Sequence, residues 1–184
     1  MSIDSPERLE ALKSDELIER YRGGTARLDA RLMQLDDAQL DQCFLPDAEV
    51  GQWSCRMLAG HLADAEIVNA FRLRKAVAES GGMLAMWDHE AWIDAGHYGG
   101  REGVAGPPVA GFVAAIHTTR LWMGDWLSTL DEAAWACRGL HAHRGEMTVR
   151  RLLAFTTWHL EHHAGFLTLK LDRLLGPAPS DGGA

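Results

Sequence analysis

The chain has 184 residues, of which 47% are apolar and 24% charged, and these fractions are typical of a globular protein. The formal net charge is −8 and the basic residues form no cluster, which argues against nucleic acid and anionic membrane as partners. No apolar run reaches the ~18 residues that a membrane span needs, and the first residues lack the apolar core of a secretory signal. This length favours one domain, expected over residues 1–175, with a flexible tail at 176–184.

The cysteines indicate a reducing environment. Cys43, Cys55 and Cys137 are odd in number, widely spaced and without a Cys-x-x-Cys pair. This pattern fits free thiols better than a disulfide framework, so a cytoplasmic protein is expected.

The first two long helices are predicted over residues 15–35 and 54–80. A short helix beginning at Ser5-Pro6-Glu7 precedes them. Ser54 is a suitable N-cap for the second long helix, and Gly81-Gly82 would end it. Apolar side chains recur at helical spacing in the first: Leu17, Tyr21, Leu28, Leu32 and Leu35.

A long connection, residues 83–107, follows and is rich in Gly, Trp and Asp, with a helical turn expected at Asp88–Trp92. Connections of this length are often functional, so we expect this one to cover the open end of the bundle near the site. A third helix is predicted over 109–130 and a fourth over 148–175, with Thr148 as N-cap and a loop at GLHAHRGEM between them. Because no strand pattern of useful length is seen, the prediction is an all-α four-helix bundle.

The last predicted helix carries three histidines in the stretch TTWHLEHHAG. His159 and His163 are one turn apart and fall within or beside the apolar stripe, whereas His162 points to its margin. Two imidazoles at this spacing can bind one metal ion, as in other helical metal sites. Two core histidines satisfied by hydrogen bonds are the other interpretation, and the spacing alone leaves both open.

The second predicted helix supplies a third candidate. His61 shares its face with Leu58, Ala65 and Val68, so it also points to the core. A single buried histidine is more often a hydrogen-bonded core residue, but three on two helices are harder to satisfy, and one divalent cation would satisfy all of them. Three neutral nitrogen ligands leave a coordination position open, and they suit zinc or nickel, with iron or manganese as alternatives.

Three further residues are candidates for roles beside the metal. Asp64, nearly one turn from His61, could orient a ligand or accept a proton, or be a solvated carboxylate. His162 could contact substrate, or be a histidine on the rim. Arg72, three turns from His61 on the same stripe, could anchor an anionic substrate or cofactor group, or extend its charge into solvent at the end of the bundle.

These motifs resemble the DinB/YfiT-like superfamily of small metal-binding four-helix bundles. The resemblance covers residues 15–175 and depends on Trp53-Ser54, the second-helix stretch 61–66, Asp88–Trp92 and His159-xxx-His163. It implies that His61, His159 and His163 bind the metal. Many relatives place Gly and then Gln after the residue that follows the last histidine, whereas this chain has Ala164-Gly165-Phe166.

The resemblance implies several functions. Some members resemble thiol-dependent S-transferases or isomerases that use low-molecular-weight thiols, and this is the activity expected first. Others resemble metal-dependent hydrolases, and a metal-containing or small-molecule-binding protein without catalysis is a further alternative. The resemblance also implies a homodimer that acts on a small-molecule substrate.

Overall fold

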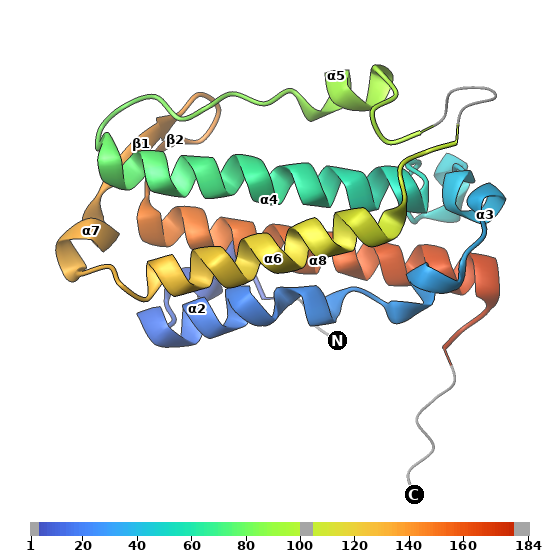
Figure 1. The fold of residues 1–184 in the computed structure, drawn as a ribbon, viewed down its shortest axis with the longest axis horizontal. Coiled ribbons are helices and arrows are strands. Elements are labelled where there is room, and N and C mark those ends of the chain that lie inside the picture. Colours follow the sequence, from blue (N-terminus) through green and yellow to red (C-terminus); the bar gives the residue numbers. More distant parts are fainter. Residues whose placement is uncertain (1–3, 100–104, 179–184) are drawn as a thin grey trace, which may run out of the picture.

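The computed structural model describes residues 4–99 and 105–178, so most of the predicted tail and the middle of the long connection lie outside the described residues. Helices α4 and α2 each pack against α6 and α8, which places them diagonally opposite one another (Figure 1). The predicted all-α bundle is confirmed, and none of the described helices is long and apolar enough to cross a membrane. The long helices are α2 (Ser14–Arg22), α4 (Cys55–Ala78), α6 (Val109–Leu127) and α8 (Val149–Leu175).

Helices α4 and α8 begin where the capping residues predicted. The Ser54 hydroxyl accepts a hydrogen bond from the backbone N–H of Met57, and the Thr148 hydroxyl accepts one from that of Arg151. Each bond satisfies a donor that the first turn of a helix leaves free. Helix α8 ends at Gly176, whose φ of 83° is costly for other residues.

The predicted first helix, 15–35, is wrong in its second half. Helix α2 ends at Arg22 and two 3₁₀ turns follow, η1 (Gly23–Arg27) and η2 (Ala30–Gln34). Arg120 of α6 donates to the Tyr21 carbonyl at 2.8 Å, and its guanidinium lies where a Cβ on Gly24 would be. Arg120 thus fills the space beside Gly24 and uses the Tyr21 carbonyl as an acceptor, and α2 therefore ends at Arg22. The apolar side chains Leu32 and Leu35 are still buried.

The predicted loop at GLHAHRGEM is also wrong, because the chain forms an antiparallel hairpin there. Strand β1 (Arg138–His141) pairs with β2 (Gly145–Thr148), and each strand has one buried residue. One inward residue in four is too short an alternation to show in the sequence. Two of the remaining short elements were predicted: α1 (Pro6–Glu10) and α5 (His89–Asp94), the latter as a helical turn at Asp88–Trp92. The others are α3 (Asp37–Asp41), η3 (Pro46–Ala48) and α7 (Glu132–Ala136).

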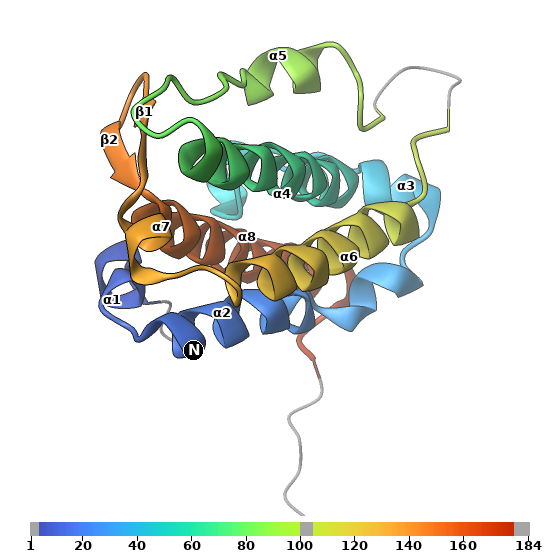
Figure 2. The ribbon, with the colours of Figure 1, turned by 60° about the vertical axis from the view of Figure 1, so that its left-hand side comes forward.

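The described parts of the connection between α4 and α6, residues 79–99 and 105–108, form a strap along the outer side of α4 (Figures 1 and 2). At its start the strap pairs with the hairpin. The N–H of Leu84 donates to the Leu140 carbonyl at 3.0 Å, and the N–H of Leu140 donates to the Gly82 carbonyl at 3.0 Å. Strap and hairpin are therefore one hydrogen-bonded unit at this end of the bundle.

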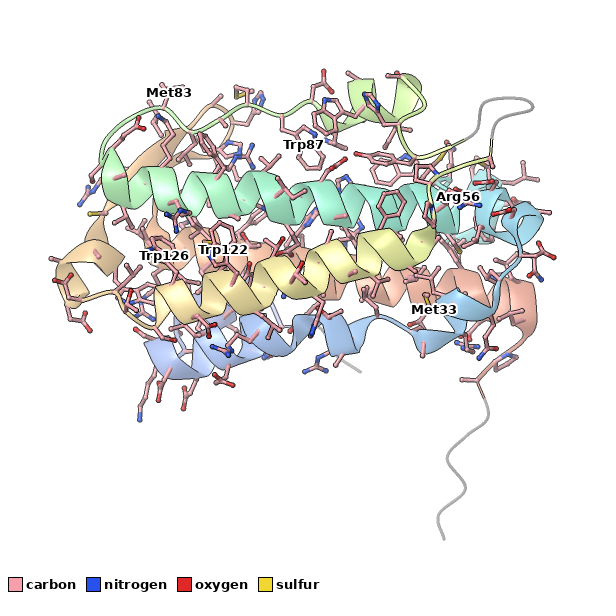
Figure 3. All side chains as sticks on the ribbon, in the orientation of Figure 1. Met33, Arg56, Met83, Trp87, Trp122 and Trp126 are labelled. Carbon is pink, nitrogen blue, oxygen red and sulfur yellow. The ribbon has the colours of Figure 1, made fainter. Side chains whose placement is uncertain are left out.

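Side chains of α4 hold the strap at three further points. Between them, Trp87 extends from the strap toward α4, and Arg56 lies near the far end (Figure 3). Gly60 makes one of these contacts possible, because a Cβ there would overlap the Tyr98 ring. The bonds are Arg72 Nε to the Ala85 carbonyl at 2.9 Å, Tyr98 hydroxyl to Asp64 Oδ2 at 2.5 Å, and Arg56 Nη1 to the Pro107 carbonyl at 2.8 Å.

Candidate metal centre

The structure brings together the three histidines that the sequence singled out. One ring nitrogen from each of His61, His159 and His163 lies within 4.8 Å of the others. The Nε2 atoms of His61 and His159 are 3.2 Å apart, and the ring centroids of His159 and His163 are 4.6 Å apart. His61 comes from α4 and is 3% exposed, whereas the other two come from α8 and are half-buried. We call these residues the histidine triad; their role as metal ligands stays a prediction.

Aromatic side chains enclose the histidine triad. Trp87 of the strap stacks on His61, with ring centroids 5.2 Å apart and an interplanar angle of 17°. Trp53, just before α4, lies 5.0 Å from His61 and stacks on His163 at 6.4 Å. His89, the first residue of α5, lies 5.3 Å from His61. The described part of the long connection therefore lies at the triad, as predicted, but it runs along the outer side of α4 and does not close an open end of the bundle (Figures 1 and 2).

Burial keeps these imidazoles neutral. Burial, together with the neighbouring imidazoles, lowers the pKa of His61 to about 3 and that of His163 to about 4. Burial also lowers the pKa of His159 well below 6.5, with contributions from His163, His61 and Arg120. The neutral imidazole is the form that binds a metal ion, so the site needs no deprotonation at neutral pH.

The triad region has polar groups that the described residues leave without partners. His61 Nδ1 and Trp87 Nε1 are buried and make no hydrogen bond within the described part of the chain. A buried polar atom without a partner costs free energy, so such atoms usually mark a bound water, ion or ligand. Three neutral nitrogen donors without a carboxylate among them fit a borderline-soft divalent ion.

Within the described residues, Asp64 makes its hydrogen bond to the strap and none to the histidine triad. Its carboxylate accepts the hydroxyl of Tyr98, which comes from the strap, and burial raises its pKa while this hydrogen bond lowers it. Asp64 therefore serves to hold the strap, and its predicted role in proton transfer has no contact to support it among the described residues.

His162 points to another side of α8. Its ring stacks on Trp158 at 4.8 Å and contacts His163 at 5.3 Å. It lines a surface groove of about 770 Å³ together with Arg20 and Glu161, and the triad is not part of that lining. This placement agrees with the predicted position at the margin of the stripe, and a role in substrate contact stays a prediction.

Sequence reasoning missed a second buried polar cluster beside the triad. Arg120 Nη2 donates to Glu66 Oε1 at 2.5 Å, and the Tyr21 hydroxyl donates to Glu66 Oε2 at 3.2 Å. All three side chains are buried. A signal existed: Arg120 continues the helical spacing of Ile116 and Met123, which are buried on α6, so its charge had to find a partner in the core.

A sequence model described as the DinB superfamily matches residues 5–167. The chain belongs to the DinB superfamily. Among its relatives in this superfamily, a protein of Oceanobacillus iheyensis is 22% identical over 95% of this chain and 94% of its own length. A protein of Bacillus licheniformis is 25% identical over 77% of this chain and 75% of its own. Both are named as candidate metal-dependent hydrolases.

Two solved structures show the same fold. YfiT from Bacillus subtilis, described as a candidate metal-dependent hydrolase with an unusual four-helix bundle topology, has a TM-score of 0.74 and 22% identity, over 90% of this chain and 89% of its own. A mycothiol-dependent maleylpyruvate isomerase has a TM-score of 0.62 and 16% identity, over 86% of this chain but only 62% of its own. At these identities the likeness concerns the fold alone.

Proposed function

We propose that this chain is an enzyme that depends on a divalent metal ion bound by His61, His159 and His163. The observation that carries the proposal is the convergence of three ring nitrogens from α4 and α8 within 4.8 Å. Three imidazoles at one point, one buried and two half-buried, are costly unless something binds them, because each must otherwise find its own hydrogen-bond partners. The relatives named as metal-dependent support the same conclusion.

The chain itself supplies binding, orientation and exclusion of water. A divalent ion, when bound, would act as a Lewis acid and lower the pKa of a water or thiol to near neutral. Trp53 and Trp87 shield the triad, which strengthens electrostatic interactions there. Asp64 and Tyr98 fix the strap that carries Trp87, so we regard them as positioning residues.

Hydrolysis is the reaction that the relatives favour. The chain matches YfiT and the Oceanobacillus protein over nearly their whole length, and both are described as candidate hydrolases. The thiol-dependent transfer or isomerisation expected from sequence is the second candidate, supported by the fold shared with the mycothiol-dependent enzyme. Zinc and nickel are the ions we propose first, since imidazole nitrogen suits both.

Metal analysis of the purified protein tests the site. We expect about one divalent ion per chain, loss of that ion in His159→Gln, and an unchanged helical circular dichroism signal. His162→Gln is the matched control, because this neighbouring histidine contacts neither His61 nor His159 by its ring. A His162→Gln protein without metal beside a His159→Gln protein with metal would overturn the ligand assignment.

Activity assays then separate the two reactions. Ester, amide and lactone substrates are offered with and without a low-molecular-weight thiol, before and after chelation. Turnover without thiol that chelation abolishes supports hydrolysis, and turnover only with thiol supports transfer. A metal-loaded protein inactive in both would support the non-catalytic alternative. The expected homodimer stays a prediction, which the mass of the purified protein in solution tests.

A further inference from the structure

Basic side chains gather without acidic partners where the hairpin turn meets α4 and the strap: Arg72, His141, His143 and Arg144. Leu140, next to His141, exchanges backbone hydrogen bonds with Gly82 and Leu84 of the strap, and Arg72 donates to the carbonyl of the next strap residue, Ala85. In agreement with this closeness, burial and the neighbouring arginines lower the pKa of His141, and burial and Arg144 lower that of Arg72. No carboxylate of the described residues forms an ion pair with Arg72 or Arg144. Like charges repel, so this arrangement leaves an unbalanced positive potential at one place.

Arg72 is the buried member of this basic cluster. Its side chain is only 7% exposed, a burial at which arginine is almost always paired with an acid. Here its partners are neutral: Nε donates to the Ala85 carbonyl at 2.9 Å and Nη1 to Asn69 Oδ1 at 3.1 Å. Nη2 makes no hydrogen bond within the described part of the chain, and it is not among the unpartnered atoms sealed from solvent. The strap and α4 therefore fix the guanidinium and leave one edge available.

Arg144, the second arginine, is exposed but held in place. Its guanidinium carbon lies 4.1 Å from the centre of the Phe155 ring, which limits the orientation of the planar group. Phe155 lies one turn before His159 on α8, and the centroids of these two rings are 5.9 Å apart. A single aromatic side chain thus connects Arg144 to the histidine triad.

Arg72 is joined to the triad by the strap. Its hydrogen-bond acceptor, the Ala85 carbonyl, is two residues before Trp87, and two extended residues span at most about 7 Å. The Trp87 ring stacks on His61. The contacts of Phe155 place the Arg144 guanidinium carbon at most about 10 Å from the centre of the His159 ring, which is the length of a small organic molecule.

We propose that Arg72 and Arg144, assisted by His141, form a subsite for the anionic group of the substrate, a carboxylate or a phosphate. The free edge of one guanidinium and a second, stacked guanidinium suit the bidentate geometry of either anion. The apolar part of the molecule lies against Trp87 and Phe155, and its reactive group reaches the triad. The placement of the reactive group at the triad rests on the proposed function, whereas binding of the anion does not. Arg144 would thus share the anchoring role that the sequence predicted for Arg72.

Three probes of similar shape test the subsite: 3-phenylpropanoate, phenyl phosphate and the neutral 3-phenylpropanamide. Binding is measured by calorimetry at constant ionic strength, and the side-chain N–H signal of Arg72 is followed by NMR. We expect saturable binding of the anions, at least tenfold tighter than that of the amide, with a shift of the Arg72 signal. The tighter anion identifies the group as carboxylate or phosphate. Anions that bind no better than the amide would overturn the proposal.

Two variants and a matched control locate the effect. Arg144→Ala removes an exposed side chain, and Arg72→Gln keeps a donor for the Ala85 carbonyl; each should weaken anion binding at least tenfold. Arg138→Ala is the control, because Arg138 is exposed on the same hairpin but paired with Glu146. Equal weakening in Arg138→Ala, or none in Arg144→Ala, would refute the subsite.

The His159→Gln protein separates this inference from the proposed function. It should bind no metal and still bind the anions. If the wild-type protein binds the anions but no metal, the proposed metal centre fails and the subsite stands. If it binds metal but not the anions, the subsite fails and the metal centre stands.

Discussion

Two buried polar clusters lie side by side in this bundle and differ in how they are satisfied. In one, Arg120 donates to Glu66, to the Tyr21 carbonyl and to the Thr156 carbonyl. Opposite charges meet there, and four helices contribute to it. In the other, the histidine triad, neutral nitrogens face one another and His61 Nδ1 has no partner among the described residues.

The comparison shows how a structural polar cluster can be told from a binding one. The Glu66 cluster is nearly complete within the chain: burial raises the pKa of Glu66, and Arg120 opposes that change. Within the described residues Arg120 Nε is the one polar side-chain atom of this cluster without a hydrogen bond, and the charges of Arg120 and Glu66 pair with each other, so the work of the cluster is to fix the packing of the helices. The triad lacks what the first cluster has, donors matched to acceptors: its neutral imidazoles bring nitrogen lone pairs together, and an external cation would accept them.

Arg120→Met should give the largest effect. The substitution leaves Glu66 buried without a counter-charge, which costs about 3–5 kcal/mol in the free energy of unfolding. Urea unfolding followed by circular dichroism measures it. The double substitution Arg120→Met with Glu66→Leu should recover much of the loss, because no isolated charge remains. A loss below about 1 kcal/mol in the single variant would show that the cluster is not a unit.

Lowering the pH should reduce the free energy of unfolding of the metal-free protein through the histidine triad. The pKa of His61 is about 3 in the folded state and 6.5 in the unfolded state, so between these values the unfolded state binds more protons. Stability is therefore lost as the pH falls below 6.5. Between pH 7 and 5, His61 accounts for about 2 kcal/mol, at 1.36 kcal/mol per pH unit.

Unfolding in urea with a chelator present, at pH 7, 6 and 5, tests this. The wild-type protein should lose about 2 kcal/mol more than His61→Gln over this range. Parallel pH dependences for the two proteins would show that His61 is not held neutral by burial.

Tyr98→Phe should have the smallest effect. It adds to the comparison of the two clusters a third polar contact, the half-buried bond between the strap and α4. It removes the hydrogen bond to Asp64, worth about 1 kcal/mol. We expect the backbone amides of the strap near Trp87 to exchange their hydrogens faster in this variant, with little change for the amides of α8. Thr118→Val is the control, since Thr118 is exposed and its hydroxyl bonds only to carbonyls of its own helix, α6. Equal exchange in the strap of Tyr98→Phe and wild type would mean that this bond does not hold it.

Local signals were sufficient for much of the fold and for the triad. Ser54, Thr148 and Gly176 set helix ends by bonds within a few residues, and the phase of α8 separates His159 and His163 from His162. The features that were missed depend on distant residues. Arg120 breaks the predicted first helix from another part of the chain, and the hairpin is extended by the strap. Neither contact produces a periodic pattern of residues from which it could be predicted.

The triad joins residues that are far apart along the chain: the bond between His61 and His159 spans 98 positions. During synthesis, which proceeds from the N-terminus, His61 exists for most of the time without its partners. A single imidazole in an unfinished chain competes poorly for ions, because the other ligands must be folded into place. The complete centre appears only when α8 has been made and has closed the bundle. On the proposed function, selection of the ion would therefore be left to the finished protein rather than to the nascent chain.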